Sequence, residues 1–157
     1  MSLEKAKAYL AERGYGDRVI ELEHSSATVE EAAAALGVEP GRIAKTLSFL
    51  IGEEPVLILA EGMAKIQNGK YKAQFHTKAK MIPWDRVEAL TGHAPGGVCP
   101  FGCNPGIPVY LDVSLKRWDT VYPAAGNDHS AVRLSIADLE DCSGFTAWID
   151  VCKEPEA

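Results

Sequence analysis

Residues 42–60 read RIAKTLSFLIGEEPVLILA and predict two neighbouring strands joined by a tight turn. Residues 42–51 alternate with the period-2 pattern of a strand, and one face would carry Ile43, Lys45, Leu47, Phe49 and Ile51. The Gly-Glu-Glu-Pro sequence at 52–55 favours a hairpin turn, and the unbroken apolar run at 56–60 indicates a central strand buried on both faces. This hairpin is therefore expected at the middle of a β-sheet.

Lys45 is the one charged residue in the apolar row of the first strand. Because burial of an unpaired charge is costly, its ammonium group must either reach the end of the strand or be held at a pocket. The pattern alone leaves both alternatives open.

Helices are predicted on both sides of this hairpin. Residues 2–13 are amphipathic and are followed by glycines, and residues 28–36 begin with a capping box formed by Thr28 and Glu31. Pro83 is expected to begin a third helix that Gly92 ends. The side chains that would point inward from this third helix are Trp84, Val87 and Leu90.

Short strands and a last helical turn complete the pattern. Strands are expected at residues 19–22, 107–112, 120–125, 131–135 and 147–151, and the helical turn at 135–139. Pro108 indicates a sheet edge or the start of a strand, and Gly126 with Asn127 favours a turn. Mixed helices and strands with hairpins between them predict an α+β fold. We expect a single domain over residues 1–157, with a central mixed, largely antiparallel sheet flanked by helices.

Length and composition narrow the class of protein. A chain of 157 residues with 46% hydrophobic residues can bury a core without disulfides or metals. It has no apolar run of membrane-spanning length, and its first residues lack the apolar core of a signal peptide. These features predict a soluble, cytoplasmic protein without membrane contact, in which the four cysteines are reduced thiols.

Charge is distributed unevenly along the chain. The net charge of -6 argues against a protein that coats nucleic acid by overall attraction. Residues 62–84, however, contain no Asp or Glu and five lysines, which are Lys65, Lys70, Lys72, Lys78 and Lys80. This stretch could contact a polyanion locally, or it could be a solvated face of the protein.

Residues 92–102 read GHAPGGVCPFG, with four glycines and two prolines. This composition predicts a loop of fixed shape rather than a helix or strand. Successive exposed N–H groups in such a loop can bind an anion or the oxygen of a carbonyl as it gains charge. The alternative is a simple connection between a helix and a strand.

Cysteine chemistry offers weaker possibilities. His93, Cys99 and Cys103 lie close in sequence, but a structural zinc site usually has a second tight pair, which Cys142 and Cys152 do not form. Cys99 could be a nucleophile, although no His and acid partner can be assigned along the chain, and a small buried filler is favoured. We expect neither a metal nor a cofactor.

Several motifs, taken in order, resemble the YbaK/ProX family of aminoacyl-tRNA deacylases, which is related to the editing insertion of bacterial prolyl-tRNA synthetases. The resemblance extends from about Ala6 to Leu139, and it rests on residues 25–33, 43–49, 92–102, 109–112 and 125–126. Members hydrolyse the ester of a wrongly charged tRNA, typically alanine or cysteine on the proline tRNA. The resemblance implies that a mischarged tRNA acceptor end is the ligand, and it allows prolyl-tRNA synthetase as a partner.

Site residues follow from the same resemblance. Lys45 matches the essential lysine of the family, and Gly96 to Pro100 match its G-x-x-x-P loop, so Lys45, Gly96 and Gly97 are the expected catalytic residues. The expected substrate-binding residues are Ser26, Val98, Cys99, Pro100 and Gly126. Lys70 matches a basic position on the face that meets tRNA, where Lys65 and Lys72 would join it. Cys99 stands where many members have Ser, and residues 127–129 depart from the usual continuation of the second loop.

A modest catalyst suffices for this chemistry because a tRNA ester is already activated. The protein must position a water or the neighbouring ribose hydroxyl and stabilise the oxyanion, which loop amides and Lys45 could do. Selectivity would come from pocket size, as in a second sieve that admits only small side chains. A non-catalytic module that binds an aminoacyl end or a small ligand in the same pocket is the alternative.

Overall fold

A four-stranded sheet forms the centre of the computed structural model, which describes residues 2–153 and the side chains from Leu3 onward. Its strands are β2 (Ala44–Ile51), β3 (Glu54–Glu61), β4 (Val109–Asp112) and β8 (Ala147–Ile149), in the order β2-β3-β4-β8. β2 and β3 form the antiparallel hairpin expected from the sequence, with Lys45 opposite Ala60. The run at 56–60 is buried throughout, as predicted for a central strand.

The predicted α+β fold with a mixed sheet is confirmed, and its parallel pairs lie in the main sheet. β3 with β4 and β4 with β8 are parallel, since long crossover segments separate these strands in the chain. The antiparallel pairs outside the main sheet are β1 (Val19–Glu21) with β6 (Ser130–Val132), and β5 (Thr120–Val121) with β7 (Leu134–Ser135). Pro108 precedes β4, so it marks the start of a strand and not a sheet edge.

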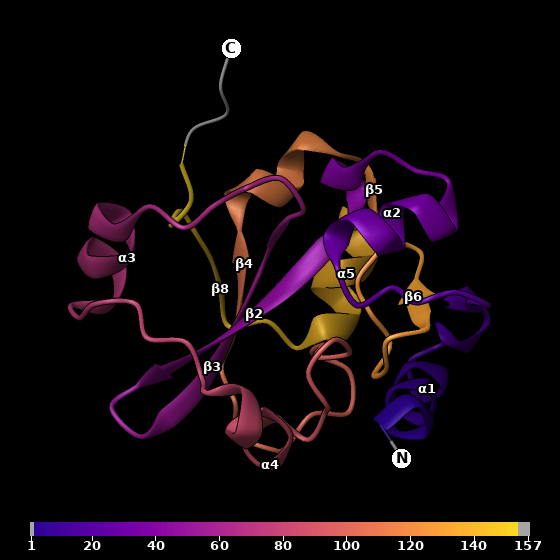
Figure 1. Cartoon of the computed structure of the whole chain (residues 1–157), viewed down its shortest axis with the longest axis horizontal. Helices are drawn as coiled ribbons and strands as arrows, with labels where there is room; N and C mark the ends of the chain where they lie inside the picture. The colour runs from indigo at the N-terminus through magenta and orange to yellow at the C-terminus, as the bar shows by residue number, and fades with distance from the viewer. Residues whose placement is uncertain (1, 154–157) are drawn as a thin grey trace.

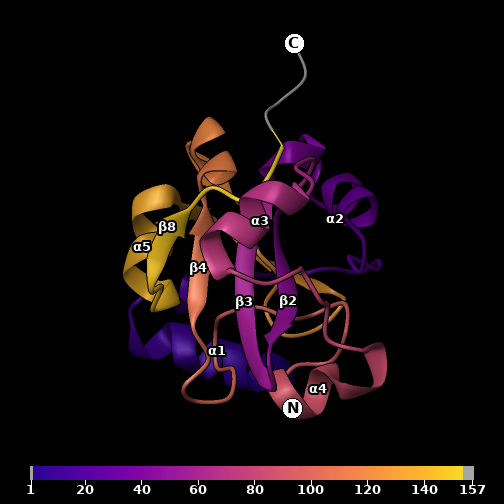
Figure 2. The same ribbon diagram turned by 90° about the vertical axis from the view of Figure 1, so that its left-hand side faces the viewer.

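Helices cover both faces of the sheet (Figure 2). α3 (Asn68–Phe75) lies on one face, where Tyr71 packs in a cluster with Phe49 and Ile58. α1 (Ser2–Glu12) and α5 (Ile136–Ser143) lie on the other, where Leu10 and Leu139 join the cluster that contains Leu57, Leu59 and Leu111. The two faces of β3 therefore belong to two separate cores, because successive side chains of a strand point in opposite directions.

α2 (Val29–Leu36) begins as predicted at Thr28, whose hydroxyl accepts a hydrogen bond from the Glu31 N–H at 3.1 Å. It ends at Gly37, which adopts φ 71°. The expected capping box is incomplete, because the Glu31 carboxylate accepts from the Thr28 hydroxyl and not from the Thr28 N–H. A complete capping box instead begins α5, where Ser135 and Asp138 bind each other's backbone N–H groups.

α4 (Val87–Thr91) is shorter than expected and follows a 3₁₀ turn at Trp84–Arg86. Val87 is buried and Leu90 packs beside it, as predicted. The expectation that Trp84 points inward is wrong, because its side chain is 77% exposed. The remaining 3₁₀ turns are Gly16–Arg18, Pro40–Arg42 and Val113–Arg117.

The glycine-rich stretch forms an irregular loop between α4 and β4, as predicted (Figure 1). Its base is closed by Asn104, whose N–H donates to the Thr91 carbonyl oxygen at 2.8 Å. Across residues 2–153 no helix has both the length and the apolar character needed to cross a membrane. The four cysteines of this part of the chain are unpaired thiols.

Candidate active site

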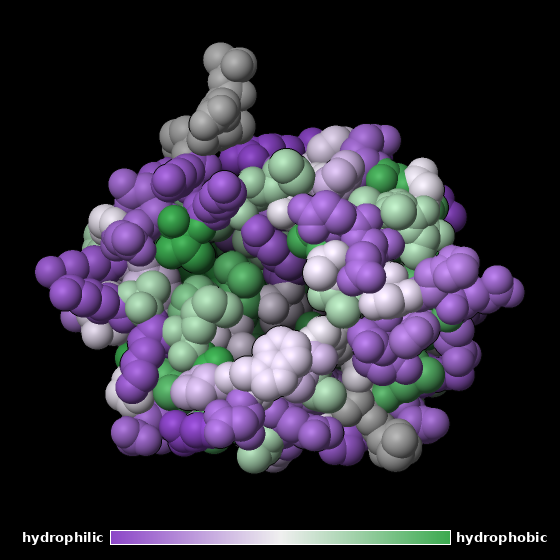
Figure 3. All heavy atoms as spheres, in the orientation of Figure 1, coloured by the Kyte–Doolittle hydropathy of each residue, from purple (hydrophilic) through white to green (hydrophobic). Residues whose placement is uncertain are grey.

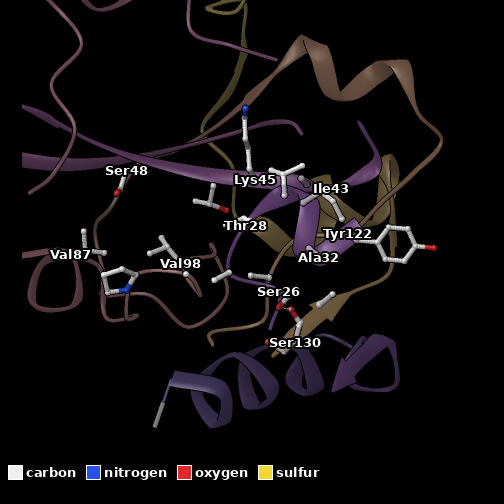
Figure 4. Close-up of a pocket in the computed structure, with 18 of the residues that line it drawn as sticks. Ser26, Thr28, Ala32, Ile43, Lys45, Ser48, Val87, Val98, Tyr122 and Ser130 are labelled. Carbon is white, nitrogen blue, oxygen red and sulfur yellow. Dashed lines mark hydrogen bonds between the residues drawn. The ribbon is translucent and has the colours of Figure 1, made fainter. Parts of the chain in front are cut away.

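A cavity of about 420 Å³ opens on the face of the molecule shown in Figure 3. One side of β2 forms its wall, and the start of α2, the glycine loop and the segment from Tyr122 to Ala131 surround it. The volume lies within the range of about 300–1,000 Å³ that is usual for small-molecule sites. The labelled side chains in Figure 4 come from segments far apart in the chain, including Ser26, Ser48, Val98 and Ser130.

Three loops meet at one side of this cavity: the segment before α2, the loop that contains Gly126, and the glycine loop. Hydrogen bonds fix the first two relative to each other. The Ser26 N–H donates to the Asp128 carbonyl oxygen at 2.6 Å, and the Ser26 hydroxyl donates to the Ser130 carbonyl oxygen at 3.4 Å. The Ser130 hydroxyl accepts in turn from the Ala125 N–H at 3.2 Å. Ser26 therefore acts as a link between the start of α2 and the loop that contains Gly126.

The glycine loop touches the Gly126 loop through Gly97. A Cβ atom at position 97 would lie 2.5 Å from the Cα of Asn127 and 2.6 Å from the carbonyl carbon of Gly126, so only glycine allows this approach. The Gly97 N–H donates to the Ala94 carbonyl oxygen at 3.0 Å, which commits it to the turn. Within residues 2–153 the N–H groups of Gly96 and Val98 have no hydrogen-bond partner, and both residues line the cavity.

Lys45 is half-buried and lines the cavity, while its side chain extends from β2 away from Ser26 and Ser130 (Figure 4). Its ammonium donates to the carbonyl oxygen of Gly62 at 3.2 Å and to that of Ala64. Burial lowers the pKa of Lys45, and the nearby Cys152 thiol and Glu61 carboxylate act in the opposite direction. The ammonium is therefore held by two backbone carbonyls just beyond the end of β3, which use two of its three N–H donors.

Sequence reasoning missed the hydroxyl groups on the cavity wall. Thr46 and Ser48 lie on the face of β2 opposite to Leu47, and both line the cavity. The Thr46 hydroxyl is buried and has no hydrogen-bond partner in the described part of the chain. The sequence does contain a signal for these hydroxyl groups, because small polar residues recur at every second position on one face of a strand that is otherwise apolar.

Cys99 and Pro100, predicted to bind substrate, do not line the cavity but are buried behind it. The Cys99 thiol is fully buried, lies 3.6 Å from Nε2 of His93 and donates to the Phe101 carbonyl oxygen at 3.5 Å. Burial raises the pKa of this thiol far above its ordinary value. This supports the interpretation of Cys99 as a filler, because a nucleophile needs an accessible thiolate.

The residues expected to bind tRNA lie on and before α3. Lys65 and Lys72 are exposed, whereas the Lys70 ammonium is 3.1 Å from the Asp150 carboxylate. Gly126 is buried beside Gly97 and does not line the cavity. Within residues 2–153 no group of three His, Cys, Asp or Glu side chains is arranged to hold a metal ion.

A family model described as the aminoacyl-tRNA editing domain matches residues 23–142, which contain the loops and strands of this cavity. The chain is 47% identical over 157 residues to YwhH of Bacillus subtilis, an uncharacterized protein, covering 99% of this chain and 100% of YwhH. EbsC of Enterococcus faecalis, named as a candidate Cys-tRNA(Pro)/Cys-tRNA(Cys) deacylase, is 32% identical over 116 residues, which cover 72% of this chain and 69% of EbsC.

A solved structure shares the whole fold. It is a crystal structure described as that of a trans-editing enzyme proposed for prolyl tRNA synthetase. The TM-score is 0.86 at 32% sequence identity, and the match covers 98% of both chains.

Proposed function

The chain belongs to the aminoacyl-tRNA editing domain family, and on this basis we propose that it is a trans-editing hydrolase that cleaves the ester of mischarged aminoacyl-tRNA. Alanyl- and cysteinyl-tRNA(Pro) are the proposed substrates. The activity belongs in the cytoplasm, where charged tRNA is used. Prolyl-tRNA synthetase is the proposed source of the mischarged tRNA.

The observation that carries this proposal is the cavity between β2 and the three loops. It has the size of a small-ligand site, and within residues 2–153 it presents a buried Thr46 hydroxyl without a partner and, at two half-buried residues, the N–H groups of Gly96 and Val98 without partners. Buried polar groups are normally hydrogen-bonded. A polar ligand with both donors and acceptors, such as an aminoacyl ester, would satisfy them.

In the proposed reaction a water attacks the ester carbonyl carbon, and the carbonyl oxygen becomes an oxyanion. The N–H groups of Gly96 and Val98 stabilise this oxygen, while Gly97 keeps the glycine loop against Asn127. Collapse of the intermediate breaks the bond to the ribose oxygen, which takes the proton from the attacking water. The products are a free amino acid and an uncharged tRNA.

Lys45 adds positive charge from the side of β2 that faces away from Ser26 and Ser130, where the carbonyl oxygens of Gly62 and Ala64 hold its ammonium. Because the ammonium is partly removed from water, its interaction with a developing negative charge is stronger than at the protein surface. The two carbonyl oxygens also fix its position, so little reorganisation is needed during the reaction.

A panel of charged tRNAs tests the proposal. Purified protein is mixed with Ala-, Cys- and Pro-tRNA(Pro), Ala-tRNA(Ala) and Cys-tRNA(Cys), and release of free amino acid is followed against the Lys45→Ala variant. We expect release of alanine or cysteine from tRNA(Pro), with Pro-tRNA(Pro) spared. Tight binding of these tRNAs without release of amino acid would contradict the hydrolase proposal and support the alternative, a non-catalytic binding module.

A further inference from the structure

Exposed apolar side chains gather at the mouth of the cavity. In residues 2–153 the large apolar side chains with high exposure are Met63, Met81, Trp84 and Val113. Met81 and Trp84, at 58% and 77% exposure, both line the cavity. Single exposed apolar residues are common on protein surfaces, but two at the rim of one cavity indicate a contact with a ligand.

The backbone beneath Trp84 is fixed although its side chain is exposed. The Leu50 N–H donates to the Lys80 carbonyl oxygen at 2.8 Å, and the Ile82 N–H donates to the Ser48 carbonyl oxygen at 3.1 Å. Residues 80–82 therefore extend the sheet beside β2, while Val87 is buried after the turn. The backbone that carries the indole is therefore in place before a ligand arrives, and stacking has to order only the two side-chain torsions of Trp84.

The charge near this rim suits a nucleic acid. Trp84 ends the stretch 62–84 that has no acidic residue, and Lys78 and Lys80 are exposed just before it. Acidic residues resume at Asp85, so the basic character lies on the side of the tryptophan toward residue 80. Aromatic side chains combined with basic residues form the usual contact surface for single-stranded nucleic acids.

We propose that Trp84, together with Met81, is a stacking platform for the base of the 3′-terminal adenosine of the tRNA. The identity of this nucleotide rests on the proposed function. When an aminoacyl group occupies the cavity, its ester places the ribose at the mouth, and the base of the same nucleoside then lies at the rim. Stacking needs no hydrogen-bond partner on the protein, in agreement with an exposed apolar pair.

Binding of a CCA trinucleotide tests the platform without any hydrolysis. Tryptophan fluorescence is titrated with this trinucleotide in the unmodified protein, in Trp84→Phe and in Trp84→Ala, and affinity is measured in parallel by calorimetry. We expect quenching that disappears in both variants, because Trp118 and Trp148 lie elsewhere in the fold. Affinity should be nearly retained in Trp84→Phe and about tenfold to a hundredfold weaker in Trp84→Ala.

Deacylation kinetics give a second measurement. Trp84→Ala should raise KM for the charged tRNA by a similar factor with kcat within about threefold, because stacking acts equally on the ground state and the transition state. Val113→Ala is the matched control, since it shortens an exposed apolar side chain that does not line this cavity. It should leave both KM and trinucleotide affinity unchanged.

The two proposals can fail separately. Trinucleotide binding that depends on Trp84, in a protein that hydrolyses no charged tRNA, would support the platform and overturn the hydrolase. Normal KM and normal trinucleotide affinity in Trp84→Ala would overturn the platform, whatever the activity.

Discussion

The Lys45 side chain is charged and partly buried, and it donates hydrogen bonds to two backbone carbonyl oxygens. Its neighbours on the same strand face, Ile43 and Leu47, are apolar, and the ammonium reaches the carbonyl oxygens of Gly62 and Ala64. Burial of the charged ammonium lowers the stability of the folded state, whereas its two hydrogen bonds raise it, so the two effects oppose each other. The net effect of Lys45 on the free energy of unfolding is therefore expected to be small.

Replacing Lys45 with Ala should separate its role in the reaction from its effect on stability. We expect deacylation to fall roughly a hundredfold or more, the range for loss of one electrostatic donor, while the free energy of unfolding changes by less than about 1 kcal/mol. Lys45→Arg keeps the charge but places a planar guanidinium where a compact ammonium fits, so it should also be slow. Single-turnover deacylation and urea unfolding measure the two effects, and near-normal turnover by Lys45→Ala would contradict the mechanism.

Cys99 is expected to matter little for the reaction. In Cys99→Ser the hydroxyl can still donate to the Phe101 carbonyl oxygen, so kcat/KM should stay within about threefold of the unmodified protein. Cys103→Ser serves as the control for loss of a thiol near the same loop. A drop of more than about a hundredfold in Cys99→Ser would restore the thiol as a catalytic group.

At the scale of elements, α3 and the segment before it carry the predicted tRNA contact. Lys65 and Lys72 are exposed, and Lys70 is engaged by Asp150, so the first two are the better positions to test. Charge attraction to phosphates releases counterions and therefore depends on salt.

Replacing Lys65 and Lys72 with Glu should raise KM for charged tRNA and flatten its salt dependence. For every phosphate that the variant no longer neutralises, the slope of log affinity against log salt concentration should decrease by about 0.7–0.9. A variant with Lys5→Glu and Lys116→Glu changes the net charge equally at exposed positions outside α3. Equal salt slopes in the two variants would direct the tRNA contact to another surface.

Local sequence patterns predicted the helices, strands and loops better than they predicted which of these segments pair with one another. The β2–β3 hairpin, the cap at Thr28 and the glycine loop follow from contacts between residues close in the chain. The parallel pairing of β4 and β8 and the junction of Ser26 with Asp128 join distant segments, which no local pattern reports. Trp84 was misplaced for the same reason, because pairing of residues 80–82 with β2 turns it outward.

At the scale of the whole molecule, the site exists because two distant loops approach at Gly97. The closest atoms to a Cβ at this position are backbone atoms of Asn127 and Gly126, which cannot move aside as a flexible side chain can.

Gly97→Ala should therefore separate the loops, with a decrease of about 1–3 kcal/mol in the free energy of unfolding and at least tenfold in deacylation. Gly106→Ala is the comparison, because its Cβ position has open space and any loss there comes from backbone strain at φ 83°, which Gly97 does not have. Urea unfolding and deacylation are measured for both. Full activity in Gly97→Ala would mean that close approach of the loops is not needed.

His93 joins the two ends of the glycine loop, residues 92–102. It is fully buried, its Nε2 is 2.8 Å from the Phe101 carbonyl oxygen, and its Nδ1 has no partner in the described part of the chain. Burial lowers the pKa of His93 below its ordinary 6.5, the bond to Phe101 opposes this, and the charge of Lys5 adds to it. The imidazole is therefore neutral in the native protein near pH 7.

Because of this lowered pKa, the free energy of unfolding should depend on pH. The unfolded chain takes up a proton near pH 6.5 while the native state resists it, so the stability from His93 is complete above pH 6.5 and is lost as pH falls toward the lower native pKa. The decline should reach a slope of up to about 1.4 kcal/mol per pH unit. In urea unfolding between pH 7.5 and 5.5, His93→Gln should lose less stability than the unmodified protein, because a glutamine does not titrate. His24→Gln, at an exposed histidine, should follow the unmodified protein, and parallel curves for all three would show that His93 accepts its proton as readily in the native state as in the unfolded chain.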